Sequence, residues 1–263
     1  MRYYGKLYIN YWRLFAKTMA QYRADLAITI GAAALHEGST LLFIGVIFSN
    51  IRQLQGWSFA EVLMIYGLMN ATQALWNVAL DVPHRIHWYI QLGRLDYLLV
   101  RPTGVLFQIA GEGGLNPTSI GRVVISIIAI IIAVREQGAT VEWWWALYLP
   151  GVMISGVLII FSVFLLLACP SFWFTNVSSL LTTISWISRL GEFPATIFGP
   201  ALQFMLTWVF PFAMIGFYPA AFLLRGDAYR FYGLVALVIG WVFLWLALAL
   251  WRISIRHYQS TGS

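Results

Sequence analysis

Long apolar runs dominate the chain and are separated by short polar stretches. A helix needs about 20 mostly apolar residues to cross a bilayer. Runs that reach or approach this length occupy residues 26–49, 59–80, 120–134, 144–168 and 231–251. Residues 172–224 hold room for one more crossing. The pattern therefore predicts an all-α polytopic membrane protein with six transmembrane helices.

The sixth crossing can be placed in two ways. Residues 201–224 are apolar enough to span, but Pro211 and Pro219 interrupt them, whereas 172–187 is shorter and rich in Ser and Thr. In the first alternative, 172–196 is a cytoplasmic connection and 201–224 is the fifth span. In the second, 172–190 is the fifth span and 194–224 is a re-entrant hairpin on the outer side, which is tolerated where it is buried in protein or lines water. Both alternatives give six crossings.

The first 24 residues lack the continuous apolar core of a signal peptide. At about 100° per residue they sort into two faces. One face is apolar and aromatic: Tyr4, Leu7, Tyr8, Tyr11, Leu14 and Phe15. The other is basic: Arg2, Lys6, Arg13 and Lys17. This pattern predicts an amphipathic interfacial helix over 1–24, lying along the membrane surface.

Lysine and arginine set the orientation, because short cytoplasmic loops carry an excess of both. With the N-terminus inside, twelve of the 16 basic residues fall in inner segments and only Arg52, Arg135, Arg225 and Arg230 fall outside. Both termini are therefore predicted to be cytoplasmic. The single transmembrane domain over 1–263 then divides into helices 1–2 at 25–80, a large cytoplasmic loop at 81–119, helices 3–6 at 120–251 and a tail at 252–263.

Composition supports a membrane protein and excludes a soluble one. The chain is 60% hydrophobic and only 10% charged, whereas soluble domains carry about 25% charged residues. The net charge of +6 fits basic loops beside anionic lipid rather than nucleic acid, because no basic cluster combines with exposed aromatics. Cys169 is the single cysteine.

No motif for catalysis, a cofactor or a metal is present in the sequence. The Gly5-Lys6 pair lacks the rest of a phosphate-binding loop. His84 and His87 could share a helix face, but no cysteine or third histidine stands near them. We therefore expect neither enzyme activity nor a nucleotide-driven motor within this chain.

His36 and Glu37 lie in the middle of the first predicted span, where a charge costs about 2.5–3.5 kcal/mol on insertion scales. At helical spacing they share a face with Thr40, and small residues, Gly31, Ala34, Gly38 and Gly45, lie roughly opposite. Two alternatives remain open. The pair is either a buried, hydrogen-bonded element of the bundle, or a polar position, with Thr40, on the translocation path or a subunit interface.

Three groups of residues resemble one family. The first is Gly56-Trp57-Ser58 with Glu61-Val62-Leu63 and Tyr66-Gly67. The second is Ile90-x-x-Gly93-x-Leu95-Asp96-x-Leu98-Leu99-x-Arg101-Pro102. The third is Phe193-Pro194 followed by Pro211-Phe212-Ala213 and Tyr218-Pro219-Ala220. Together, over about residues 50–225, they resemble the type-2 ABC exporter permeases, the six-helix transmembrane subunits of ATP-binding cassette transporters. His36 and Glu37 are not part of this pattern.

The resemblance implies partners and a location. Such permeases pair as dimers, with an identical or homologous second permease subunit, and ATP is bound by two cytosolic ATPase subunits. The membrane implied is a bacterial-type plasma (inner) membrane. On these grounds the re-entrant alternative for 194–224 is preferred.

The resemblance also implies a site that couples the chain to the ATPase. A short helix in the first cytoplasmic loop docks on the ATPase, and residues 84–96 match it. Pro83 starts this stretch, Trp88 and Tyr89 are its anchors, and Arg85, Arg94 and Asp96 provide polar contacts. The alternative function is a self-contained, proton-coupled secondary carrier using Glu37 and His36, although no internal repeat typical of such carriers is visible.

Overall fold

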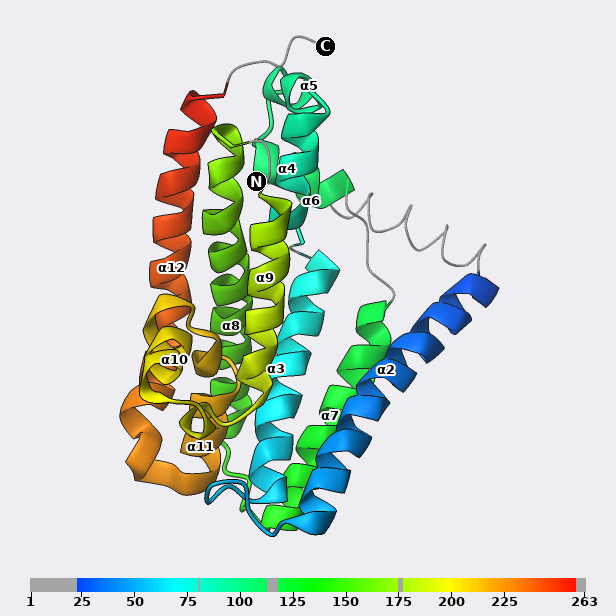
Figure 1. Ribbon diagram of the computed structural model, residues 1–263, viewed down its shortest axis with the longest axis vertical. Helices are drawn as coiled ribbons and strands as arrows, with labels where there is room; N and C mark the ends of the chain where they lie inside the picture. The colour runs from blue at the N-terminus through cyan, green and yellow to red at the C-terminus, as the bar shows by residue number, and fades with distance from the viewer. Residues whose placement is uncertain (1–22, 80, 113–117, 175–176, 259–263) are drawn as a thin grey trace.

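The computed structural model describes residues 23–79, 81–112, 118–174 and 177–258 of the chain (Figure 1). These residues form helices and no β-strand, apart from one isolated bridge between Leu54 and Trp57. The predicted all-α class is therefore confirmed. The predicted interfacial helix over 1–24 falls almost entirely outside the described residues.

Five long helices run side by side along the long axis of the molecule (Figure 1). They are α2 (Arg23–Asn50), α3 (Phe59–Ala79), α7 (Thr118–Gln137), α8 (Trp145–Ala168) and α12 (Arg230–Arg256). Each contains one of the apolar runs of the sequence. Three helical stretches of the described chain are long and apolar enough to cross a membrane: Arg23–Asn50, Trp145–Phe172 and Phe212–Arg256.

Small residues let neighbouring helices approach closely. On α12, a side chain at Gly240 would collide with the backbone of Ser155 on α8, and the Gly240 N–H donates to Ser155 Oγ at 3.1 Å. On α3, a side chain at Gly67 would meet Ile130 of α7 at 2.6 Å. Close approach of this kind replaces the hydrophobic driving force that is missing between helices in lipid.

Helix α2 approaches α7 closely at Gly121, where a side chain would meet the Ile30 carbonyl at 2.8 Å, but it has few buried residues. It lies at the edge of the bundle against α7 (Figure 1), and only Glu37 and Ile44 are buried along its 28 residues. The three glycines of the predicted small-residue stripe gain no close partner within the described chain, because nothing lies within 4 Å of a side chain built at Gly31, Gly38 or Gly45.

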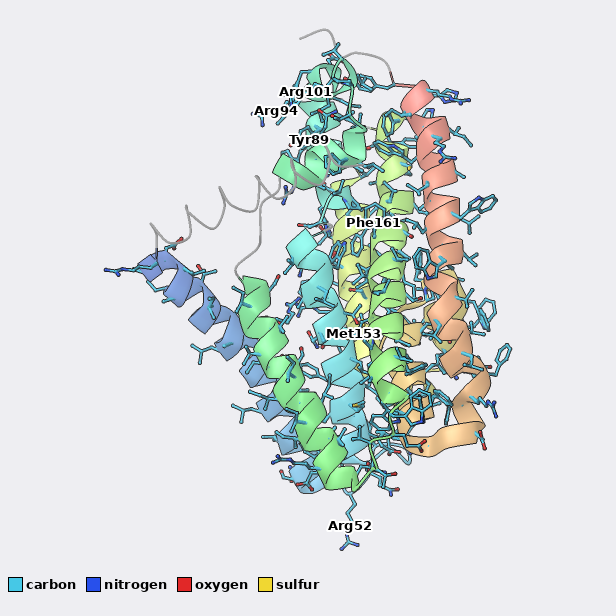
Figure 2. All side chains as sticks on the ribbon, turned by 180° about the vertical axis from the view of Figure 1, so that it is seen from behind. Arg52, Tyr89, Arg94, Arg101, Met153 and Phe161 are labelled. Carbon is cyan, nitrogen blue, oxygen red and sulfur yellow. The ribbon has the colours of Figure 1, made fainter. Side chains whose placement is uncertain are left out.

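The two ends of the bundle differ in content. One end carries α4 (Pro83–Gln91), α5 (Leu95–Leu99) and α6 (Val105–Glu112), and is called the α4 end. The opposite end carries the loop 51–58 and is called the Trp57 end. Figure 2 shows Tyr89, Arg94 and Arg101 at the α4 end and Arg52 at the opposite end.

The chain between α8 and α12 is broken into short helical pieces. After the 3₁₀ turn Cys169–Phe172, α9 (Ser178–Ser188) runs beside α8. A series of short pieces follows: Arg189–Glu192, Ala195–Ile197, α10 (Pro200–Phe204), a π-helical turn at Met205–Val209, Phe212–Met214, α11 (Phe217–Arg225) and Gly226–Tyr229.

The path of this segment favours the second sequence alternative over the first. Trp57 Nε1 donates to Thr196 Oγ1 at 2.7 Å, so Thr196 lies at the Trp57 end rather than at the α4 end. A connection over 172–196 that stayed at the α4 end would be incompatible with this contact. In addition, 201–224 is no continuous helix, because Pro211 and the π-helical turn divide it. The first alternative is therefore wrong.

Candidate functional site

A polar tie joins three helices inside the bundle. Glu37 of α2 is only 5% exposed. Its Oε1 accepts hydrogen bonds from Nε and Nη2 of Arg122 on α7, both at 2.7 Å. Its Oε2 accepts a hydrogen bond from the hydroxyl of Tyr66 on α3 at 2.8 Å. Each carboxylate oxygen thus has a hydrogen-bond donor, the charged Arg122 for Oε1 and the neutral Tyr66 for Oε2. A buried charge is costly without such partners.

Of the three residues predicted for the translocation path or a subunit interface, the structure builds only Glu37 into the core. His36 is exposed, and its Nδ1 is 3.7 Å from Glu37 Oε1. Thr40 Oγ1 donates to the backbone carbonyl of His36 at 3.4 Å. Arg122, which sequence reasoning counted only as an inner basic residue, is the main partner of Glu37. An acid inside a predicted span needs a cation or donor nearby, and that requirement was the available signal.

A second cluster fastens the Trp57 end. Arg225, at the end of α11, donates from Nε to Glu61 Oε1 at 2.5 Å and from Nη2 to Glu61 Oε2 at 2.9 Å, a bidentate pair. Its guanidinium carbon lies 3.6 Å from the centre of the Trp57 ring, a cation–π contact. The hydrogen bond to Glu61 raises the pKa of Arg225 above its ordinary value. These contacts join residues 164 positions apart.

The same cluster begins α3. The Ser58 N–H donates to Glu61 Oε2 at 2.8 Å, and the Glu61 N–H donates to Ser58 Oγ at 3.3 Å. This reciprocal arrangement is a capping box, which satisfies two backbone donors at the helix start. Ser58 therefore caps the start of α3. We call Trp57, Ser58, Glu61 and Arg225 the end clamp.

The α4 end is held by apolar contacts. On α4, Ile86, His87 and Ile90 are buried against the bundle, and Pro83 occupies the first helical turn as the sequence predicts. The ring of His84 is 4.5 Å from that of Phe164 on α8. Burial lowers the pKa of His87, and its Nδ1 has no hydrogen-bond partner among the described residues.

Aromatic and basic side chains are exposed at this end. Trp88 is 57% exposed, and Arg94 is exposed as well, while Arg85, Tyr89 and Asp96 are half-buried. Other large exposed apolar residues of this end are Leu92, Tyr97 and Val100. We call the exposed side chains of Trp88, Leu92, Arg94, Tyr97 and Val100 the α4-end surface.

A left-handed glycine and the end of α12 shape the α4-end surface. Gly93, with φ +65°, ends α4, and its N–H donates to the Ile90 carbonyl at 3.1 Å. Asp96 lies near Tyr258, which follows α12. Burial and then the Asp96 carboxylate raise the pKa of Tyr258 to about 12. Of the five residues predicted for ATPase coupling, Trp88 and Arg94 are the exposed ones, whereas Arg85, Tyr89 and Asp96 are half-buried.

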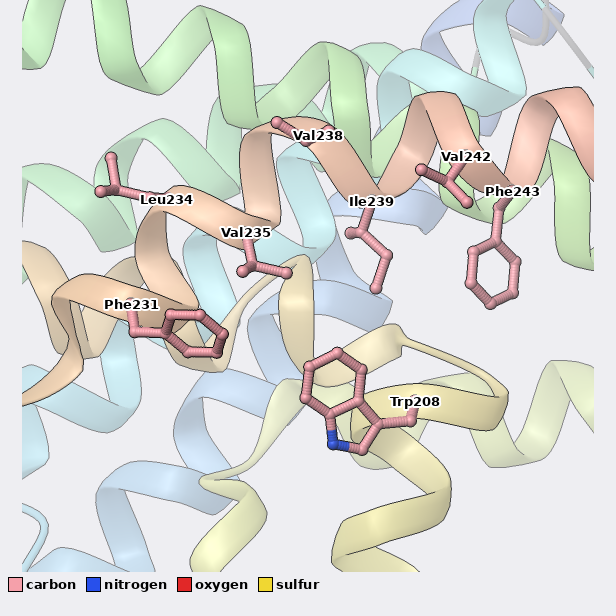
Figure 3. Close-up of a pocket in the computed structure, with 8 residues that line it drawn as sticks. All are labelled: Trp208, Phe231, Leu234, Val235, Val238, Ile239, Val242 and Phe243. Atoms are coloured by element: carbon pink, nitrogen blue, oxygen red, sulfur yellow. The ribbon is translucent and has the colours of Figure 1, made fainter.

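An apolar groove of about 630 Å³ lies between α12 and the π-helical turn (Figure 3). Trp208 forms one wall, and the side chains that α12 contributes are all apolar: Phe231, Leu234, Val235, Val238, Ile239, Val242 and Phe243. Such a surface suits contact with lipid chains. In the part of the chain that the structure describes, no three His, Cys, Asp or Glu residues gather as metal ligands would.

Comparison with known proteins agrees with this architecture. A search of curated proteins finds no match to the chain. The family described as ABC-2 family transporter protein matches residues 34–262. That range holds Glu37, the end clamp and the α4-end surface, and it covers most of the chain. The chain therefore belongs to the ABC-2 family of membrane transporter proteins.

Proposed function

We propose that the chain is the transmembrane permease subunit of an ATP-binding cassette exporter, coupled to separate cytosolic ATPase subunits. In this proposal six helices cross a bacterial-type inner membrane, both termini and the α4 end face the cytosol, and a second permease subunit completes the pathway. The observation that carries the proposal is the α4-end surface, which exposes an aromatic anchor on a firmly seated helix in a chain of this family.

Two physical features support a coupling role for α4. A contact that transmits motion must not yield, and α4 is fixed by the buried Ile86, His87 and Ile90 and by a left-handed glycine at its end. A protein interface also needs anchors, and tryptophan is enriched among the residues that dominate binding energy. Trp88 is such an anchor, and within the described chain its ring is left largely uncovered.

The proton-coupled carrier receives less support. A proton-carrying carboxylate has to exchange partners during transport, whereas both oxygens of Glu37 are already bonded to Arg122 and Tyr66. His36, its proposed companion, points away from the bundle core. The polar tie is better suited to holding α2 in place.

The experiment replaces Trp88 by alanine in the complex purified with its native partners. Loss of an interface anchor costs about 2 kcal/mol or more, so we expect the ATPase to dissociate roughly thirtyfold more readily. The matched control is Trp143→Ala, because Trp143 is also exposed but belongs to the loop before α8 at the Trp57 end. Equal ATPase retention and equal ATP hydrolysis in both variants would show that this surface does not couple the chain to an ATPase.

A further inference from the structure

A small polar cavity lies within the subunit, away from the end clamp and the α4-end surface. Its volume is about 140 Å³, and α3, α7, α8 and the end of α9 surround it. The polar lining consists of Gln73, Asn77, Arg122, Ser185, Ser188 and Arg189. A cavity of this size accommodates a few water molecules or one small polar group, but not a whole lipid.

The cavity lies part-way along α3, nearer to its α4 end than to its Trp57 end. At 1.5 Å per residue, Gln73 is roughly 20 Å along α3 from Phe59, and Arg189 shares the cavity with it. Arg189 follows directly on α9, which ends after only 11 residues. Broken helices of this kind commonly surround binding sites inside membrane transporters.

The two arginines of the cavity differ in how their charge is balanced. Arg122 is paired with Glu37 at 2.7 Å. Arg189 has no ion pair with any described residue, and its guanidinium lies 5.2 Å from the ring of Trp186. Glu192 interacts with Arg189 electrostatically but at longer range, and its carboxyl bonds to Asn70. Arg189 is exposed, so its guanidinium borders the cavity at its open side and remains accessible to a ligand.

The remaining lining favours an anion as well. Trp76 is 6% exposed, and its Nε1 has no hydrogen-bond partner among the described residues. The amide groups of Gln73 and Asn77 can donate hydrogen bonds, and Phe164 provides an apolar wall. The cavity thus combines one unbalanced guanidinium, several donors and an apolar side.

We infer that this cavity binds an anionic group, such as the phosphate of an amphiphilic molecule, with Arg189 as its principal partner. The guanidinium fork donates two hydrogen bonds to one phosphate or carboxylate, and the adjoining apolar wall receives the carbon atoms next to the charge. Binding itself does not depend on the proposed transport function, whereas the interpretation of the ligand as exported cargo does.

Binding is tested with the detergent-purified protein and three probes: dioctanoylphosphatidylglycerol, dioctanoylphosphatidylcholine and inorganic phosphate. We expect tighter binding of the anionic lipid than of the zwitterionic one. Arg189→Gln should weaken binding of the anionic lipid by about tenfold or more, since it removes a charge-assisted pair. Arg252→Gln is the matched control, because Arg252 is exposed on α12 and does not line the cavity.

Two further variants separate the cavity from a general charge effect. Ser185→Leu fills the space but leaves Arg189 in place, and it should weaken binding as Arg189→Gln does. Glu192→Gln removes a negative charge near Arg189, so it should strengthen binding. If inorganic phosphate competes with the anionic lipid, soluble anions are ligands of the cavity. If it does not compete, the ligand is the lipid headgroup.

Equal affinity for the two lipids would overturn the inference, and so would unchanged binding in both Arg189→Gln and Ser185→Leu. Retention of the ATPase, measured on the same preparations, reports separately on the proposed permease function. A preparation that binds the anionic lipid but retains no ATPase would contradict the permease and leave the cavity supported.

Discussion

The two ends of the bundle are stabilised by different physics. At the Trp57 end, hydrogen bonds and a cation–π contact join residues from the first loop, α3 and α11. At the α4 end, buried apolar side chains hold a helix whose other side exposes Trp88. A closed polar network resists change, whereas an apolar seat with an uncovered aromatic surface suits a partner. The comparison indicates that the Trp57 end is a fixed structural element, whereas the α4 end is suited to contact with a partner.

The largest expected effect is on the end clamp. Arg225→Ala removes the bidentate partner of the buried Glu61, and leaving a buried charged acceptor unsatisfied costs about 3 kcal/mol. We expect a clear fall in the thermal unfolding midpoint of the detergent-purified protein. The control is Arg230→Ala, because Arg230 pairs with Asp227 at 3.8 Å, and the Asp227 side chain is 94% exposed. Similar midpoints for the two variants would remove the distinction between the two ends.

The next effect concerns the polar tie between the ends. Glu37→Gln leaves Arg122 with an unbalanced charge, which costs roughly 2 kcal/mol, and α2 has few other buried contacts. Hydrogen exchange of the α2 amides should therefore become faster. The double variant Glu37→Gln with Arg122→Gln should recover much of the protection, since no lone charge remains.

His36→Gln, at the exposed neighbouring position, is the control for this experiment and should leave exchange unchanged. If the double variant exchanges as fast as Glu37→Gln alone, the ion pair does not hold α2.

A smaller effect is expected at the end of α4. Gly93→Ala places a Cβ at φ +65°, a strain of about 1–2 kcal/mol, and it should tilt α4 and reduce ATPase retention. Gly138→Ala introduces the same strain at φ +60° but after α7, at the Trp57 end. Only the first variant should affect retention. Equal losses in both would show that retention follows general strain.

The smallest effect is a pH dependence of the packing of α4 against the bundle, which we call the α4 seat. Burial lowers the pKa of His87 below its ordinary 6.5, so the unseated helix binds a proton more readily than the seated one. The stability of the seat is therefore complete above about pH 6.5 and decreases as the pH falls below that value. Hydrogen exchange of α4, corrected for intrinsic rates, should rise on acidification in the native protein and not in His87→Phe. His257→Phe, at an exposed histidine, should behave like the native chain.

Local features of the fold were accessible from sequence, because their causes are local. The capping box needs only Ser58 and Glu61 three residues apart, and Pro83 marks a helix start by its missing donor. Apolar runs likewise predicted the long helices. The broken segment after α9 left two alternatives, since Pro211 and a Ser- and Thr-rich stretch do not determine which run packs inside the bundle.

Long-range partners were not accessible in the same way. Glu37 and Arg122 are 85 positions apart, and Glu61 and Arg225 are 164 apart, so no spacing rule connects them. In the carrier alternative His36 acts with Glu37, and their side chains do approach to 3.7 Å, but His36 is 56% exposed and Glu37 is buried. Consecutive helical residues point about 100° apart, so Glu37 faces α7 while His36 stays at the surface. Tertiary packing, not helix periodicity, selected Glu37.

The contact between Ser155 and Gly240 has a mechanical consequence. With no side chain at Gly240, the backbones of α8 and α12 come into contact, and the Gly240 N–H bond to Ser155 Oγ joins them. A push on α4 reaches α8 through the His84–Phe164 ring contact, and α8 is about 36 Å long at 1.5 Å per residue. We therefore expect α8 and α12 to move together as a rigid pair. The size of the displacement at the Trp57 end would then depend on how far the pair rotates and not on bending of either helix.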